Sequence, residues 1–270
     1  MKIASFNING IKARLEALSA YLSGAGADVD VICLQEIKSV DEGFARDHFE
    51  AMGYAVETHG QKSFNGVAIL SKLPLSDVTR GLGGDDSDTQ ARWIEATVQG
   101  KTPVRVCGLY LPNGNPVEFD GDTPIESGKY GYKLAWMARM QARVAQILAQ
   151  EIPAVFCGDY NIIPADIDAA KPASWQRDAL ALPPSRAAYR RLINLGLTEA
   201  LRTLNPAAPH LYTYWDFQAG AWERNNGIRI DHHLLTPAAA DLLTGAGVDK
   251  AERGRDRPSD HVPIWITLNA

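Results

Sequence analysis

AVFCGDYNII, residues 154–163, predicts a buried strand that ends in polar side chains. Gly158 stops an apolar run, and Asp159 and Asn161 follow two residues apart. Taking a carboxylate out of water is costly unless a cation or hydrogen-bond donors offset the cost, so this arrangement indicates a functional site at the mouth of a strand. The alternative is a simple turn, because Asp and Asn both tolerate turn conformations. This stretch alone does not decide between the two.

Composition and charge narrow the class of protein. With 270 residues, 46% of them apolar, the chain can bury a sizeable core as one large domain or two small ones. The formal net charge is -5 at pH 7, so no global positive field points to nucleic acid or to an anionic membrane. A polyanionic partner would therefore need local basic patches or metal ions.

The cysteines and the first residues indicate the compartment. Cys33, Cys107 and Cys157 each lie in or at the end of an apolar run, and an odd, unclustered set argues against a disulfide framework or a structural zinc site. Met1 leads directly into a predicted strand at residues 2–6, which leaves no room for a signal peptide, and no apolar run is long enough to span a bilayer. We expect a cytoplasmic protein of bacterial type without a membrane partner.

The pattern of apolar residues predicts about four helices among many strands. The strongest helix covers residues 134–148, and Leu15, Leu18 and Leu22 mark an earlier one that ends near Gly24. Ser39 and Ser185 are the predicted N-caps of two further helices, which end at Gly53 and Gly196. Strands are predicted at residues 2–6, 29–34, 54–58, 67–70, 93–98, 104–109, 211–214, 229–235 and 262–268.

Two irregular regions, residues 112–131 and 164–184, interrupt this pattern, and long loops in compact domains are usually functional or disordered. Successive strands without helical crossovers imply antiparallel pairing, so a single doubly wound sheet does not fit. We predict an α/β fold with two sheets packed face to face and helices outside. No linker or repeat divides the chain, so residues 1–270 are predicted to form one domain, and no apolar stripe suggests more than a monomer.

Polar side chains stand at the ends of six predicted strands. If these ends converge, Glu36, Asp159, Asp231 and Asp260 bring four carboxylates into one pocket, which is unfavourable without a divalent cation. Oxygen ligands without clustered cysteines suit Mg²⁺ or Mn²⁺ better than zinc. The remaining members of the set are Asn7, Gln35, Tyr110, Tyr160, Asn161, Ser259 and His261.

A histidine beside an acid suggests how the pocket would work. In Asp260-His261, with another acid available on a different strand, the imidazole can be oriented for chemistry, although a surface turn would look the same. The sequence contains no nucleophile-elbow motif, and Cys157 is better explained as a core residue. The chemistry should then use water directly.

Eight motifs in these strand ends resemble those of the exonuclease III class of abasic-site endonucleases, within the endonuclease, exonuclease and phosphatase superfamily. They run in the family's order from the first strand to the last, which makes the resemblance specific and extends it over essentially the whole chain. The motifs are SFNING (5–10), LQEIK (34–38), NGVAILS (65–71), YLPNG (110–114), GDYN (158–161), YTYWD (212–216), GIRID (227–231) and SDHVP (259–263).

The resemblance implies a four-layer α/β sandwich of the deoxyribonuclease I type, with two mixed sheets, that hydrolyses DNA phosphodiesters with Mg²⁺ or Mn²⁺. It implies that Glu36 is the principal metal ligand, with Asn7 and Asp260 beside it. Asp159 would orient or deprotonate the attacking water with Asn161 as its partner. Asp231 would orient His261, while His261 and Tyr110 contact the scissile phosphate.

The implied substrate is double-stranded DNA with abasic sites or with blocked or recessed 3′ ends. The implied reaction is cleavage 5′ to the abasic site to leave a 3′-hydroxyl, together with 3′-phosphodiesterase or 3′-to-5′ exonuclease activity. The residues that resemble the family's substrate-binding set are Tyr214, Trp215, Ile228, Ile230, Arg229 and Asn113, although Tyr212 and Trp215 could equally be core. Candidate cations for the DNA backbone are Lys12, Arg14, Lys38, Arg92, Arg224 and Arg229.

Two other functions stay open. A non-catalytic nucleic-acid-binding regulator could share the fold, since a fold does not determine a function, but a pure binder has no need of four converging carboxylates. The same metal site could also hydrolyse another phosphodiester, such as a lipid head group or an RNA tail.

Overall fold

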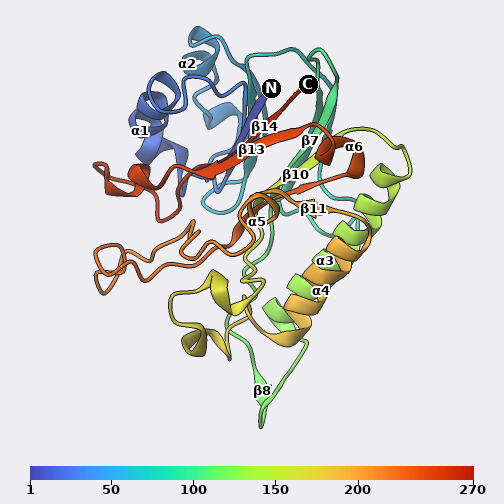
Figure 1. The fold of residues 1–270 in the computed structure, drawn as a ribbon, viewed down its shortest axis with the longest axis vertical. Coiled ribbons are helices and arrows are strands. Elements are labelled where there is room, and N and C mark those ends of the chain that lie inside the picture. The colour runs from blue at the N-terminus through green and yellow to red at the C-terminus, as the bar shows by residue number, and fades with distance from the viewer.

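Two six-stranded sheets lie face to face in the computed structural model, which describes residues 1–270 (Figure 1). The first sheet has the order β13-β14-β1-β2-β4-β3 and the second the order β11-β12-β10-β7-β6-β5. The first contains β1 (Lys2–Asn7), β2 (Val31–Gln35), β3 (Ala55–His59), β4 (Val67–Ser71), β13 (Leu243–Val248) and β14 (Ile264–Leu268). The second contains β5 (Leu75–Arg80), β6 (Trp93–Val98), β7 (Val104–Tyr110), β10 (Ala154–Asp159), β11 (Thr198–Glu199) and β12 (Asp231–Leu235).

Both sheets are mixed, and each contains one parallel pair that matters for the site. β1 runs parallel to β2, with Asn7 opposite Gln35, and β7 runs parallel to β10, with Tyr110 opposite Asp159. All other pairs are antiparallel, including β10 with β12, where Asp159 lies opposite Asp231. Because parallel strands end at the same edge of a sheet, the residues that follow β1, β2, β7 and β10 are brought together there.

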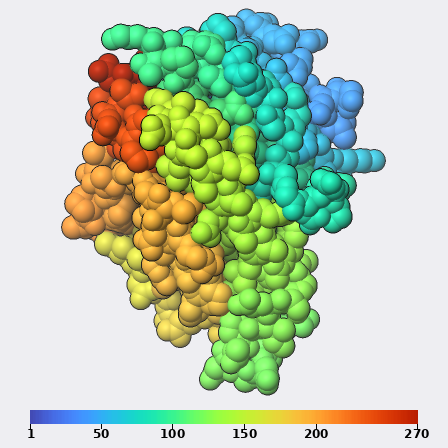
Figure 2. All heavy atoms as spheres, turned by 90° about the vertical axis from the view of Figure 1, so that its right-hand side faces the viewer, coloured from blue at the N-terminus to red at the C-terminus, as the bar shows by residue number.

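Helices cover the outer face of each sheet. α1 (Ile11–Ser23) and α2 (Arg46–Ala51) pack on the first sheet, and α3 (Gly128–Leu148) and α4 (Pro183–Asn194) pack side by side on the second (Figure 2). The expected four-layer sandwich is therefore confirmed. Its shorter elements are α5 (Ala200–Leu204), α6 (Pro237–Ala240), the hairpin β8 (Phe119–Asp120) with β9 (Thr123–Pro124), and 3-10 turns at Asp41–Gly43, Asp166–Asp168, Pro172–Trp175 and Lys250–Gly254.

One apolar core lies between the sheets and one lies beneath each helical layer. The central cluster combines Ile3, Val31 and Cys33 of the first sheet with Val106 and Cys157 of the second. These strands are apolar on both faces, which explains why they appear in the sequence as continuous apolar runs. The three cysteines are all buried and free, as the sequence predicted.

Both predicted serine N-caps are wrong, although a helix follows each. Ser39 Oγ bonds the Val40 carbonyl, a 3-10 turn comes next, and α2 begins only at Arg46. Ser185 lies inside the first turn of α4, where its buried hydroxyl bonds the Ala179 carbonyl at 2.6 Å. Each hydroxyl is thus used by a contact outside the helix end, and proline opens α4 instead.

The other differences concern boundaries. Residues 211–214 form no strand, and only Tyr214 makes isolated bridges, to Ile228 and His261. Part of the predicted loop at 112–131 is ordered, because it contains the β8–β9 hairpin and the first turn of α3. β5 and β13 were not predicted; both are half exposed and lack a continuous apolar run. No helix is both long enough and apolar enough to cross a membrane.

Candidate active site

A small cavity opens where the ends of both sheets meet. Its volume is about 190 Å³, and it is reached by residues from segments that are far apart in the sequence. Most of the predicted site residues line it, so the strand ends converge as expected. The lining consists of Glu36, Tyr110, Asn113, Asn115, Asp159, Asn161, Trp175, Asp178, Leu180, Tyr214, Ile230, Asp260 and His261.

Asp159 lies at the end of β10 and is almost completely buried. Its Oδ1 accepts the Asn161 backbone N–H at 2.8 Å, and its Oδ2 accepts from Asn7 Nδ2 at 3.0 Å. The second bond joins the two sheets, since Asn7 ends β1. Burial, opposed by the charge of His261 and reinforced by that of Asp231, raises the pKa of Asp159 to about 7.

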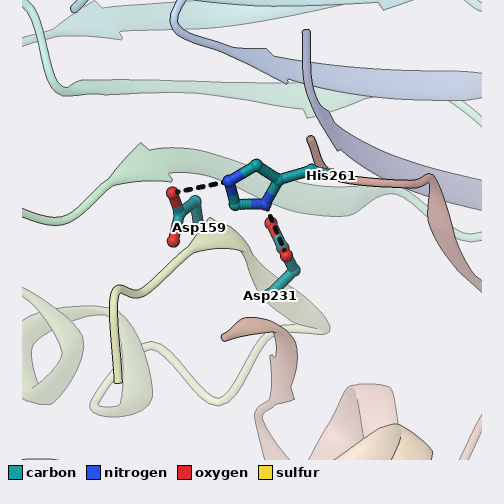
Figure 3. Close-up of side chains that lie close together, drawn as sticks. All are labelled: Asp159, Asp231 and His261. Atoms are coloured by element: carbon teal, nitrogen blue, oxygen red, sulfur yellow. Dashed lines mark hydrogen bonds and ion pairs between the residues drawn. The ribbon is translucent and has the colours of Figure 1, made fainter. Parts of the chain in front are cut away.

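His261 lies between two carboxylates (Figure 3). Its Nδ1 bonds Asp231 Oδ2 at 2.8 Å, and its Nε2 lies 3.6 Å from Asp159 Oδ2. Burial alone would lower the pKa of His261, but the charges of Asp231 and Asp159 outweigh it and raise the pKa to about 10. Near pH 8 the imidazole is therefore protonated while Asp159 is ionised.

Thr213 fixes the position of Asp231. Its hydroxyl donates to Asp231 Oδ2 at 2.6 Å and accepts the backbone N–H groups of Ile230 and Asp231, each at 3.2 Å. The same carboxylate oxygen thus receives Thr213 and His261, and the imidazole plane is set by a buried chain of three side chains. Thr213 was not predicted from the sequence, although it lies in the YTYWD motif.

Two asparagines stand beside Asp159. Asn161 has a left-handed backbone with φ of 46°, a conformation that asparagine adopts more readily than most residues. Its Nδ2 donates to the Leu111 carbonyl at 2.9 Å, and its Oδ1 accepts from Asn113 Nδ2 at 3.0 Å. The loops after β7 and β10 are therefore joined side chain to side chain at the cavity wall.

Glu36 approaches the cavity from the first sheet. Its Oε1 accepts from Asn7 Nδ2 at 2.9 Å, and its Oε2 lies 3.0 Å from Lys38 Nζ. Burial acts to raise the pKa of Glu36, but the hydrogen bond from Asn7 and the charge of Lys38 outweigh it and hold the pKa below its ordinary value. Asn9 connects this group to Asp260, whose Oδ1 accepts from Asn9 Nδ2 at 3.0 Å.

Two sets of side chains could hold a cation. Asp159, Asp231 and His261 have potential ligand atoms within 4.8 Å of one another. In this first set, His261 Nδ1 is bonded to Asp231 Oδ2 at 2.8 Å and Nε2 lies 3.6 Å from Asp159 Oδ2, so both ring nitrogens already face a carboxylate. Glu36 and Asp260 fit better, because both are carboxylates that line the cavity. The Lys38 ammonium lies between Glu36 and Asn9, 2.6 Å from Asn9 Oδ1, so a positive charge is already accommodated beside Glu36.

Tyr110 completes the polar wall. Burial, followed by the charges of Glu36 and Asp159, raises the pKa of its phenol well above the ordinary range, so the hydroxyl stays protonated and can donate. The Arg92 guanidinium lies 4.8 Å from the centre of the Tyr110 ring. Arg92 also bonds Gln90 and the Tyr110 carbonyl, which makes it a support for Tyr110.

The predicted substrate-binding residues are divided by the structure. Tyr214, Ile230 and Asn113 line the cavity, and the Tyr214 ring stands edge-on to His261 with centroids 5.0 Å apart. Ile228 is buried in the apolar cluster behind them. Trp215 is fully buried, with its indole N–H bonded to Asn225 at 3.2 Å, and so belongs to the core.

Arg229 is also misassigned by the sequence prediction. It is 2% exposed, and its guanidinium bonds Asp168 at 2.8 Å and Glu199 at 3.0 Å. Arg202 and His232 join the same buried network. A guanidinium enclosed in this way cannot contact a DNA phosphate. Of the other candidate cations, Lys12 and Arg224 are exposed and Arg14 and Lys38 are half-buried.

Sequence reasoning predicted Tyr214 and Ile230 on the apolar side of the cavity but missed two further residues there. Trp175 and Leu180 enter it from the irregular segment between β10 and α4, where Trp175 closes a 3-10 turn. They extend the wall formed by Tyr214 and Ile230. The only available signal was an apolar pair within a long loop, because no periodicity marks such residues.

Several known proteins resemble this chain in sequence and in structure. The profile of the endonuclease/exonuclease/phosphatase family matches residues 4–261. The chain belongs to this family. It is 35% identical over 272 residues to exodeoxyribonuclease III of Haemophilus influenzae, covering 98% of each chain.

Two solved structures align with this chain over the full length of both chains. A 3′ phosphatase from Neisseria, solved bound to a product DNA hairpin, is 34% identical with a TM-score of 0.92. An AP endonuclease from Archaeoglobus fulgidus is 33% identical with a TM-score of 0.90. The family is divalent-metal dependent, which agrees with the carboxylates that meet at the cavity.

Proposed function

We propose that this chain is a divalent-metal-dependent DNA repair nuclease that cuts the phosphodiester 5′ to abasic sites and leaves a 3′-hydroxyl. It would also process 3′ ends, as a 3′-phosphodiesterase or 3′-to-5′ exonuclease. One observation carries the proposal: a single cavity is lined by Asp159 and His261, the Glu36 and Asp260 carboxylates and an apolar wall, and His261 is bonded to the buried Asp231. The named activities of the relatives support it.

Asp159 is the group placed to activate water. It is ionised above pH about 7 and has both oxygens held in place, so it can accept a proton from a water molecule directed at phosphorus. Asn161 would hold that water beside the carboxylate. The water oxygen bonds to phosphorus as its proton passes to Asp159, the bond from phosphorus to the 3′ oxygen breaks, and that oxygen takes up a proton from solvent and leaves as the 3′-hydroxyl.

His261 and Tyr110 supply donors for the phosphate. The imidazolium is oriented by Asp231, and the phenol is held protonated by its surroundings, so both can bond the oxygens on which charge accumulates. Asn113 reaches the same side through its amide. These donors are fixed before the substrate binds, which is the condition under which they lower a barrier most.

Glu36, Asp260 and Asn7 are the residues that would hold Mg²⁺ or Mn²⁺. Such an ion supplies Lewis-acid neutralisation of phosphate charge. Asn7 makes no charged contribution, but its Nδ2 bridges Glu36 and Asp159 at 2.9 and 3.0 Å and so keeps the metal-binding carboxylate and the base apart.

The apolar wall fits a sugar without a base. The cavity of about 190 Å³ is smaller than the 300–1,000 Å³ typical of sites for drug-sized ligands, so it suits a deoxyribose and its phosphate better than an intact extruded nucleotide. Trp175, Leu180, Tyr214 and Ile230 would exclude water around that sugar. An abasic residue is also the easiest to extrude, because its pairing is already lost.

The test uses three duplexes: one with a single abasic analogue, one with a 3′-phosphate and one with an intact recessed 3′ end. Each is incubated with protein and Mg²⁺, Mn²⁺ or EDTA. We expect metal-dependent cleavage of the abasic duplex and removal of the 3′-phosphate. Tight binding of all three without cleavage would instead identify a non-catalytic regulator.

We also propose that the protein acts as a monomer. Its exposed large apolar residues are scattered over separate segments, at Val40, Phe64, Ile125, Ile167, Leu204 and Phe217, and form no stripe. Light scattering at the concentration of the cleavage assay would show the mass of one chain, and a dimer mass would contradict the proposal.

A further inference from the structure

Lys133 is a buried cation next to the active site that the proposed chemistry does not use. It lies near the beginning of α3 with no exposed surface. Its ammonium donates to three backbone carbonyls, those of Asn161 at 2.7 Å, Asn113 at 3.1 Å and Pro112 at 3.2 Å. All three N–H donors of the ammonium are therefore used.

This arrangement is costly for a residue that serves stability alone. None of the ion pairs in the structure includes Lys133, so no carboxylate directly offsets the loss of its hydration. Burial lowers its pKa to about 7, which reflects the same cost. Well-packed apolar residues are often at least as stable as buried charges. The ammonium must therefore do something that an apolar side chain cannot.

The three carbonyls belong to the two loops that carry the site amides. Pro112 and Asn113 follow β7, and Asn161 follows β10. The side chains of Asn113 and Asn161 meet on the cavity side of the same backbone, 3.0 Å apart. Lys133 therefore binds the backbone of the same two loops whose side-chain amides meet at the cavity.

The fit around the lysine stem is close. A Cβ on Gly114 would lie 2.7 Å from Lys133 Cδ, so the loop passes over the stem only because this residue is glycine, with φ of 93°. Asn161 also has a left-handed backbone, with φ of 46°. Both loops thus pass Lys133 in left-handed backbone conformations that glycine and asparagine can adopt.

We propose that Lys133 is a positioning residue for the nuclease reaction. It fixes the separation of the Asn113 and Asn161 amides through the backbone carbonyls of their own loops. The inference rests on the proposed function of these two asparagines. A displacement of about 1 Å in such groups can cost on the order of a hundredfold in rate.

The test is Lys133→Met, which keeps the length and removes the charge and the donors, measured on the abasic duplex at saturating Mg²⁺. We expect kcat to fall roughly ten- to a hundredfold, with KM within about threefold of the wild-type value because DNA backbone contacts outside the cavity are unchanged. Lys129→Met is the matched control, since Lys129 is exposed on the same helix, and it should leave kcat unchanged. If Lys133→Met does not fold, Lys133→Gln, which is uncharged and keeps two N–H donors, replaces it.

Rescue separates positioning from simple loss of structure. In Lys133→Ala, added ethylammonium can enter the vacated space and should restore at least part of kcat. Ethanol, a neutral molecule of the same size, should not. Combining Lys133→Met with Asn113→Ala should lower kcat by less than the product of the two single losses, because Lys133 acts in part through the Asn113 amide.

A folded Lys133→Met variant with kcat within twofold of wild type would overturn the inference, as would fully additive losses in the double variant. A failure of the proposed function would be recognised separately, because the wild-type protein would then bind the abasic duplex without cleaving it, or Asp159→Asn would cleave it at the normal rate, whatever Lys133 does.

Discussion

Replacing Asp159 by Asn tests the assignment on which the proposed mechanism depends. The substitution keeps the size of the side chain and removes its charge. The side-chain oxygen of the new Asn can still accept the Asn161 backbone N–H, which lies 2.8 Å from Asp159 Oδ1 in the wild type. The other position becomes an NH₂ group that faces two donors, Asn7 Nδ2 and His261 Nε2. The change therefore removes the base and one acceptor together.

The expected loss of rate follows from the proposed role of Asp159 as the general base. Loss of general-base proton transfer lowers rates by about 10²–10⁴-fold, which corresponds to roughly 3–5 kcal/mol in the activation free energy. We expect turnover of Asp159→Asn to fall by at least about a hundredfold.

Stability should change little, because two effects oppose each other. The pKa of Asp159 is raised from 3.8 to about 7, so at pH 8 the folded protein bears a penalty of roughly 4 kcal/mol for ionising it, which Asn avoids. The same substitution removes one of the two carboxylates that stabilise the His261 imidazolium. A melting temperature near that of the wild type would confirm that the lost rate is chemical.

The assay is single-turnover cleavage of the abasic duplex with enzyme and Mg²⁺ in excess, so that product release does not contribute. Asp166→Asn is the matched control, since its side chain is 74% exposed and pairs only with Arg186. It should react within about twofold of wild type. An Asp159→Asn rate within tenfold of wild type, in a folded protein, would refute the role of Asp159 as base.

Three further predictions concern pH, stability and the metal. His261 has its pKa raised from 6.5 to about 10 in the folded protein, so its contribution to stability is complete below pH about 6.5 and is lost as the pH rises toward 10. Lys133, whose pKa is lowered to about 7, acts with the opposite sign as the pH rises above 7, so the two groups oppose each other in the wild type. In the metal-free Lys133→Met variant, the free energy of unfolding should therefore fall with a slope of up to about 1.4 kcal/mol per pH unit between pH about 7 and 10, and a flat profile in urea titrations would contradict it. Asp168→Asn leaves the buried Arg229 guanidinium without its two-oxygen partner and should cost about 3–5 kcal/mol in urea unfolding, whereas the exposed Asp122→Asn should cost under about 1 kcal/mol; equal costs would argue against the network. EDTA should abolish cleavage, and Glu36→Gln should raise the half-saturating Mg²⁺ concentration on the order of tenfold or more, so an unchanged Mg²⁺ titration would remove Glu36 from the metal site.

The polar residues at strand ends could be predicted because their positions follow from the sheet. Asn7 and Glu36 lie at the ends of the parallel strands β1 and β2, and Tyr110 and Asp159 lie at the ends of the parallel strands β7 and β10. Parallel neighbours end at the same edge of a sheet. The change from a continuous apolar run to polar residues marks these ends locally. The fold class follows from the same pattern, because strands in direct succession require antiparallel pairs.

Burial of the charged and aromatic residues could not be predicted in this way. Arg229 is enclosed by Asp168, 61 residues earlier, and by Glu199, neither of which is marked by a local pattern. Trp215 lies two residues after Thr213, which supports Asp231, yet it turns into the core. Whether a side chain lines a cavity or packs behind it depends on contacts between distant segments.

The same limit explains the helix caps. Ser185 has the right chemistry to cap a helix, but Ala179 offers a carbonyl and Tyr130 a hydroxyl at 3.1 Å, so tertiary contacts take the side chain. Propensity is a weak preference that a buried partner overrides. Trp175 and Leu180 escaped for another reason, because residues in irregular segments have no period to reveal them.

The hydrogen bond from Asn7 to Asp159 has a consequence for when the protein can become active during folding. The first sheet supplies Glu36, the proposed metal ligand, and the second supplies Asp159, the proposed base, while His261, which precedes β14, contacts Asp231 and Asp159 of the second sheet. Neither sheet alone contains a complete set of groups, so a partly folded chain cannot cut DNA. A substrate that touches both sheets favours their docked arrangement by mass action. The rate of cleavage therefore measures how much of the population has its two halves joined.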